Sequence, residues 1–197
     1  MVRVWDTATG ERRQSFEGKP GQTWGVAFSP DGSLLAASSW DEGVVRVWDI
    51  VTGDLVSETG PIAASFTTSF SPDGRQLAIA SFDSESIVVD VRTGAEVLAL
   101  EGHLQGAVDV DWSPNGRWIS TSGLDGTVRI FDARTGRPES ALYGHRGEVV
   151  AADWSCASHS SCSSSVDSAA RSKSRLVIPT PRVGMAASCA ASSAARA

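Results

Sequence analysis

Apolar and polar residues alternate in short segments along the first 155 residues, and this alternation predicts β-strands. The clearest case is the stretch 107–142, in which "VDVDW", "RWISTS", "TVRIF" and "PESAL" occupy 108–112, 117–122, 127–131 and 138–142. Side chains of a strand point to its two faces in turn, so a period of two is typical of a strand. Turn residues bound each segment, and the four segments are therefore expected to form an antiparallel meander.

The same pattern returns about every 42 residues. A turn signature reads "FSPDG" at 28–32, "FSPDG" at 70–74 and "WSPNG" at 112–116. Pro presets the first corner of such a turn, Asp or Asn bonds nearby backbone, and Gly accepts a positive φ. A second signature, ending in Thr-Gly, closes at Gly10, Gly53, Gly94 and Gly136. Because the signatures keep register with one another, the sequence predicts repeated four-stranded units.

These repeats resemble the WD40 family, through "GH" at 102 and 144, "SPDG", and "VRVWD" at 2 and 45. The nearly regular repeats are similar in style to bacterial members. The resemblance covers residues 1–155 and implies an all-β fold, a partial WD40-type β-propeller of about three and a half four-stranded blades. Propellers close with about 4 to 8 blades, so we expect an incomplete propeller that is a fragment of a larger regulatory protein.

Residues 156–197 differ sharply from the rest. They carry Ser and Ala in excess and no aromatic residue, whereas all seven Trp and six Phe precede Ser155. We expect this segment to be a disordered low-complexity tail. Its onset in mid-motif suggests a frameshifted end of a longer repeat protein. A zinc site is a weaker alternative for the tail, with the residues Cys156, His159, Cys162 and Cys189 as its candidate ligands.

The net charge of residues 1–155 limits the classes of partner that this part of the chain can bind. Of 17 Lys and Arg residues five lie in 156–197, and of 23 Asp and Glu residues one does, which leaves 12 basic and 22 acidic residues in 1–155. Such an acidic body repels phosphate, so we expect no direct nucleic-acid partner. No segment reaches the roughly 20 apolar residues of a membrane helix and no signal peptide is evident, so we expect no membrane partner and a cytoplasmic location.

His103, Asp125 and a nearby hydroxyl invite comparison with a hydrolase triad. The resemblance implies a different role. In the WD40 family, the His of "GH", a hydroxyl on the second strand and the Asp of the second hairpin form a structural hydrogen-bond network, which corresponds here to His103, Thr121 and Asp125. Phe131 stands where the family has Trp and has no N–H, so we expect the network to end at the hydroxyl. We predict no catalytic, metal-binding or cofactor-binding residues.

Aromatic residues divide into two groups. Those of the "WD" and turn signatures are expected to pack between neighbouring blades: Trp5, Trp48, Phe28, Phe70 and Trp112. Trp24 and Phe66 lie four residues before a turn aromatic, at the top of the first strand of a blade. The resemblance places this position near the central channel, where relatives contact partners. Trp24 and Phe66 are therefore candidate partner contacts, with simple packing as the alternative.

The function that follows is a non-catalytic scaffold for protein partners whose identity the sequence does not give. Open blade edges also favour self-association. A truncated gene product without independent function is one alternative. A propeller-type hydrolase is a weaker one, since it needs a catalytic cluster that departs from the repeat, and two of the three histidines, His103 and His145, belong to the "GH" series.

Overall fold

The computed structural model describes residues 1–17, 22–62, 64–82, 85–155 and 174–179. These residues fold into β-strands joined by turns. The first sheet is a hairpin of β1 (Val2–Trp5) and β2 (Arg12–Phe16). The next sheet holds β3 (Thr23–Phe28), β4 (Leu34–Ser39), β5 (Val44–Asp49) and β6 (Leu55–Thr59). It is followed by β7 (Ser65–Phe70), β8 (Gln76–Ser81), β9 (Ser86–Asp90) and β10 (Glu96–Leu100). The last complete sheet holds β11 (Ala107–Trp112), β12 (Trp118–Gly123), β13 (Val128–Asp132) and β14 (Pro138–Leu142). Two further strands pair with each other, β15 (Val149–Ser155) and β16 (Ser174–Pro179).

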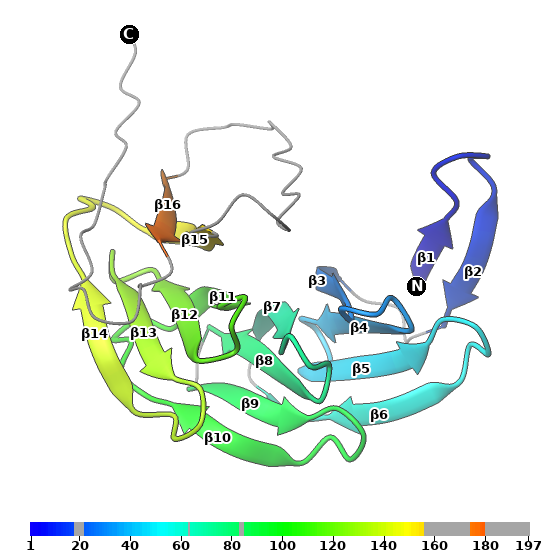
Figure 1. Cartoon of the computed structure of the whole chain (residues 1–197), viewed down its shortest axis with the longest axis horizontal. Helices are drawn as coiled ribbons and strands as arrows, with labels where there is room; N and C mark the ends of the chain where they lie inside the picture. The colour runs from blue at the N-terminus through cyan, green and yellow to red at the C-terminus, as the bar shows by residue number, and fades with distance from the viewer. Residues whose placement is uncertain (18–21, 63, 83–84, 156–173, 180–197) are drawn as a thin grey trace, which may run out of the picture.

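Three of these sheets are four-stranded antiparallel meanders, each with its strands in chain order. We call them the first, second and third blades, beginning at β3, β7 and β11. The blades stand side by side in an open arc (Figure 1). The first strand of each blade lies on the inner side of the arc and the fourth strand lies on the outer rim (Figure 1). The prediction of an all-β, blade-like fold is confirmed. Across the part of the chain described, no helix is long and apolar enough to span a membrane.

The predicted strands of 107–142 agree closely with the third blade, since each observed boundary lies within one residue of its prediction. Local turn chemistry explains the agreement. In the turn after β11, Ser113 Oγ donates to Asn115 Oδ1 at 2.8 Å and accepts the Trp118 N–H at 2.8 Å. Gly116 closes this turn with a φ of 70°. Ser29 and Ser71 make the corresponding bonds in the other two blades, so the turn chemistry repeats with the sequence.

The hydrophobic core lies between neighbouring blades. Because both faces of a blade are apolar, each blade buries one face against the sheet before it and one against the sheet after it. Phe70 of the second blade packs with Ala36 and Val45 of the first. Trp112 of the third blade packs in the same way with Ala78 and Val88 of the second. The small residues at 36 and 78 leave room for the aromatic ring of the next blade.

The face of the first blade toward the β1–β2 hairpin is only partly covered within the described residues: Leu35 and Trp48 are buried there with Phe16, but β3 is not covered. Phe28 is 55% exposed, whereas the residues at the same place in the next blades, Phe70 and Trp112, are only 6% and 7% exposed. Trp5 is also exposed. The prediction that signature aromatics pack between blades thus holds for Trp48, Phe70 and Trp112 but is wrong for Trp5 and Phe28. Both lie in sheets at the N-terminal end of the arc, where fewer strands pack against them.

The predicted disordered tail, 156–197, contains one described element, β16, which pairs in parallel with β15. The segment "SRLVIP" has three consecutive apolar residues, two of them β-branched, which favour a strand. Among the described residues β15 pairs with no strand other than β16, so an edge of β15 is available for this pairing. The other tail residues, including the zinc candidates Cys156, His159, Cys162 and Cys189, lie outside the described residues.

Candidate functional site

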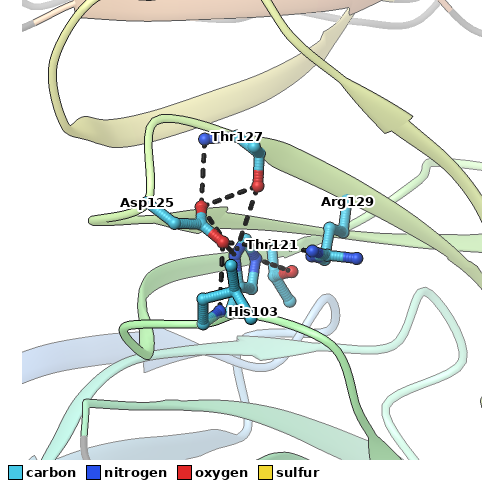
Figure 2. Close-up of polar contacts among 6 residues, drawn as sticks. His103, Thr121, Asp125, Thr127 and Arg129 are labelled. Atoms are coloured by element: carbon cyan, nitrogen blue, oxygen red, sulfur yellow. Dashed lines mark hydrogen bonds and ion pairs between the residues drawn. The ribbon is translucent and has the colours of Figure 1, made fainter.

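The structure brings His103, Thr121 and Asp125 together in the third blade (Figure 2). His103 comes from the loop before β11, Thr121 from β12 and Asp125 from the hairpin between β12 and β13. His103 Nδ1 lies 3.1 Å from both carboxylate oxygens of Asp125, and His103 Nε2 lies 2.8 Å from Thr121 Oγ1. The imidazole therefore links a loop, a strand and a hairpin that are separate in the sequence.

Asp125 also accepts hydrogen bonds from its surroundings. The Leu104 N–H donates to Oδ2 at 3.1 Å, while the N–H and hydroxyl of Thr127 donate to Oδ1 at 3.0 and 2.7 Å. Burial alone would raise the pKa of Asp125, but the donors from Thr127, Leu104 and His103 outweigh burial and lower this pKa to about 2. The carboxylate is therefore ionised at neutral pH.

His103 is neutral beside this carboxylate. Burial lowers the pKa of His103, and the positive charge of Arg129 adds to that effect, against the opposing influence of Asp125. An ionised Asp125 only accepts, so Nδ1 of the neutral ring carries the proton and Nε2 accepts from the Thr121 hydroxyl. The order carboxylate, imidazole, hydroxyl is that of a hydrolase triad. However, Thr121 is only 1% exposed, so a substrate cannot reach its hydroxyl, and this geometry favours a structural role.

Gly123 makes room for the network, and the sequence analysis missed it. A Cβ on Gly123 would lie 2.2 Å from His103 Nδ1 and 2.7 Å from Asp125 Oδ1, so only glycine fits without displacing the pair. The sequence contains a signal for this residue. At the same place in the first and second blades stand Ser39 and Ser81, and only the blade with a Gly-His loop has glycine there.

A second feature is a surface cluster of four aromatic side chains, which we call the aromatic cluster: Trp24, Trp40, Phe66 and Phe82. The ring centroids of Trp24 and Phe66 are 5.1 Å apart with the planes at 88°, and those of Trp40 and Phe66 are 4.9 Å apart at 63°. Trp40 and Phe82 also touch, at 5.8 Å. Such edge-to-face contacts are the favoured geometry of aromatic pairs. Trp24 remains 53% exposed, so the cluster combines fixed rings with an accessible indole.

Close approach of the first two blades creates the cluster. Ser38 Oγ accepts the Gly25 N–H at 2.8 Å and donates to the Phe66 carbonyl at 2.8 Å, which joins β3, β4 and β7. A Cβ on Gly25 would lie 2.5 Å from that carbonyl, so glycine is required for this approach. The neighbouring side chains of Trp24 and Phe66 are consequently held against each other.

The cluster arises from two rows of residues, of which the sequence analysis recognised one. Trp24, Phe66 and Val108 form the row at the start of the first strands. Residues at the ends of the second strands form another row with the same spacing of 42: Trp40, Phe82 and Leu124. The regular spacing of 42 residues could have predicted that Trp40 and Phe82 lie at equivalent places in neighbouring blades. Phe82 and Leu124 also line a pocket of about 1070 Å³ between the second and third blades, which His103 and the exposed Leu104 border.

A hollow of about 420 Å³ lies beside Trp24 on the inner strands, and three aspartates line its opposite side: Asp109, Asp111 and Asp153. Their neighbours hold them in place. Thr67 Oγ1 donates to Asp109 Oδ1 at 3.1 Å, and Ser69 Oγ donates to Asp111 Oδ1 at 3.0 Å. Over the residues described, no three His, Cys, Asp or Glu side chains are grouped so as to hold a metal ion.

The family model described as WD domain, G-beta repeat matches residues 10–49 and 94–132. The chain contains WD40 repeats. Each matched segment begins at a Thr-Gly turn, continues through the last strand of one sheet and then takes in the first three strands of the next sheet. The two segments contain β2 to β5 and β10 to β13. A WD40 repeat thus crosses from one blade to the next, and the strand order of the intervening β6 to β9 is the same.

Curated proteins similar to this chain include a translation initiation factor subunit and a WD repeat-containing protein. A 56-residue segment is 43% identical to eukaryotic translation initiation factor 3 subunit I of Aspergillus terreus, and covers 28% of this chain and 16% of that protein. A 61-residue segment is 36% identical to the periodic tryptophan protein 2 homolog of Schizosaccharomyces pombe, covering 31% and 7%. The WD repeat-containing protein VIP3 of Arabidopsis thaliana is 33% identical over 57 residues, covering 29% and 18%. The chain matches only a small part of each relative's length.

Among solved structures, the WD40 blades are similar to the computationally designed Ika8 protein, with a TM-score of 0.66 and 28% sequence identity. The similarity covers 75% of this chain and 44% of the designed one. The blades described above therefore superpose on about half of a larger protein.

Proposed function

We propose that the chain is a non-catalytic platform on which partner proteins bind, and that it acts in the cytoplasm as part of a larger regulatory protein. WD40 repeats and WD-repeat relatives support a protein-interaction scaffold in general. The observation that carries the proposal for this chain is the aromatic cluster, since Trp24 is half exposed while Phe66, Trp40 and Phe82 fix the surface around it. Fixed, accessible tryptophans dominate the binding energy of many interfaces.

The uncovered side of β3 in the first blade supports the proposal that the chain is part of a larger protein. Val26 and Phe28 are 56% and 55% exposed, although the corresponding residues of the next two blades are buried by their neighbours. Strands of the same repeat type would cover this face, whether they come from a longer polypeptide or from a second copy. Self-association through these open edges belongs to the same proposal.

The proposal is tested by quantitative affinity capture with the full chain and with Trp24→Ala and Phe66→Ala, followed by titration of each purified candidate. Val51→Ala is the matched control because Val51 is an exposed apolar residue in the turn between β5 and β6. A genuine partner should bind the Trp24 variant at least about tenfold more weakly, as expected for a hot-spot residue, and bind the control normally. A partner set that responds to neither cluster variant would refute the platform, and a large fall in melting temperature would assign Trp24 to packing.

A further inference from the structure

The pocket of about 1070 Å³ between the second and third blades has apolar walls and an open side. Ile62, Leu100 and Ala107 line it and are buried, so these walls belong to the packed core. Leu104 also lines the pocket but is 88% exposed. The volume matches that of large ligand sites in proteins, so the pocket offers apolar surface that a bound segment would cover.

An irregularity of the repeat lies beside the pocket. In the third blade, His103 joins the loop before the first strand to the hairpin residue Asp125 (Figure 2). In the second blade, Pro61 stands at the place of His103. Its side chain has no polar group and cannot make the bridging hydrogen bond. Pro61 lines the pocket instead, together with Glu85 and Ser86, so the pocket occupies a place where the second blade has no histidine bridge.

The charges around the pocket are negative. Glu85 and Glu96 line it and are both exposed, and within the described residues neither carboxylate has a hydrogen-bond or ion-pair partner. None of the described lining residues is Lys or Arg. Arg129 lies next to Gly102, but its guanidinium is 4.0 Å from the carboxylate of Asp125, which balances its charge. The edge of the pocket therefore favours a cation.

We infer that the pocket receives apolar residues of a partner segment, and that a neighbouring lysine or arginine of the same segment pairs with Glu85 or Glu96. This inference rests on the proposed function and names the chemistry of the partner. Phe82 lines the pocket and also contacts Phe66 and Trp40, with ring centroids 5.6 and 5.8 Å apart, so one segment can cover both surfaces. The two carboxylates would repel an acidic segment, and a purely apolar segment would leave them without a partner.

The test uses methyl NMR on the full chain, labelled at the isoleucine δ1 methyl groups. Ile62 and Ile87 both line the pocket and are assigned by Ile62→Val and Ile87→Val. The probes are acetyl-Phe-Leu-Lys-Leu-amide, the same peptide with Nε-acetyllysine, which lacks the charge, and the same peptide with glutamate. The lysine peptide should shift both signals saturably and bind about two- to fivefold more tightly than the acetyllysine peptide. The glutamate peptide should bind most weakly. Ile130, which packs with Val149 on the other side of the third blade, should not respond.

Two variants sharpen the result. The double variant Glu85→Gln/Glu96→Gln keeps the size of both side chains but removes their charges, so the lysine and acetyllysine peptides should bind it almost equally. Glu139→Gln is the matched control, since Glu139 is an exposed residue of β14 that does not line the pocket, and the preference for lysine should persist there. Leu104→Ser should weaken all three peptides about threefold or more, because it removes apolar contact area.

Three results would overturn the inference. The first is equal binding of the lysine and acetyllysine peptides to the unaltered chain. The second is an unchanged preference for lysine in the double variant. The third is the lack of any saturable shift at Ile62 and Ile87.

The outcome is separable from that of the proposed function. If the peptides show no preference for charge but Trp24→Ala still weakens a purified partner, the assignment of the pocket fails and the platform remains. If the peptides bind as expected but no partner responds to Trp24→Ala or Phe66→Ala, the pocket remains and the aromatic cluster is not the platform.

Discussion

Replacement of Asp125 by alanine should destabilise the third blade strongly. Two buried donors lose their acceptor, the Nδ1–H of His103 and the hydroxyl of Thr127, whereas the Leu104 N–H lies at an exposed residue where water replaces the lost bond. Each stranded buried donor costs about 1 to 3 kcal/mol. The expected loss is therefore at least about 2 kcal/mol, a large fraction of the 5 to 15 kcal/mol that typically stabilises a domain.

The assay is urea unfolding followed by tryptophan fluorescence. With a slope of about 1 to 3 kcal/mol per molar urea, the midpoint should fall by about 1 M. Asp41→Ala is the matched control, because Asp41 occupies the same place in the first blade but is exposed, and its carboxylate accepts the Gln22 N–H. It should shift the midpoint far less. Equal shifts for the two variants would refute the reasoning, since they would show that the cost comes from the hairpin and not from the network.

Three further predictions concern other residues of the blades. Gly123→Ala should lower the urea midpoint about as much as Asp125→Ala does, because the new Cβ displaces His103. The double variant should lose clearly less unfolding free energy than the sum of the two single losses, and additive losses would count against a shared network. Because burial lowers the pKa of His103, the unfolded chain binds a proton at this residue before the folded chain does as the pH falls below about 6.5. The free energy of unfolding should therefore decrease between pH 7.5 and 5.5 by more in the native chain than in His103→Gln. Identical pH profiles for the two proteins would contradict this. Phe70→Ala should lower the free energy of unfolding by about 3 to 5 kcal/mol because Phe70 is buried, whereas Phe28→Ala should lower it by less than about 1 kcal/mol because Phe28 is half exposed. Thermal unfolding measures both losses. Comparable losses would mean that the ring of Phe28 is covered in solution.

Local chemistry explains why much of the fold could be predicted from the sequence. Each turn depends on residues within five positions of one another, as with the Ser113 hydroxyl that bonds Asn115 and Trp118. Strand boundaries follow from such turns. The residues of the network could likewise be assigned through the resemblance, since His103, Thr121 and Asp125 each occupy a motif position.

Exposure could not be predicted in the same way, because it depends on what stands next to a blade. Phe28 and Phe70 occupy the same motif position and differ in exposure only because the second blade has a complete neighbour before it. The aromatic cluster escaped prediction for a related reason. Trp40 and Phe66 are 26 residues apart and meet across the boundary between two blades, so no local pattern joins them.

The places where the repeat is irregular distinguish the blades from one another. In the third blade, Val108 and Leu124 replace the aromatic pairs of the first two, and the network around His103 fastens the hairpin. In the first and second blades that network is incomplete, since Lys19 and Pro61 stand where the third has its histidine. Rings at the hairpin ends, Trp40 and Phe82, make the contact between these blades instead. Two different devices thus fasten equivalent hairpins, one buried and polar, the other partly exposed and aromatic. The aromatic device leaves Trp24 half exposed whereas the polar device is buried, so we expect binding to concentrate on the first two blades.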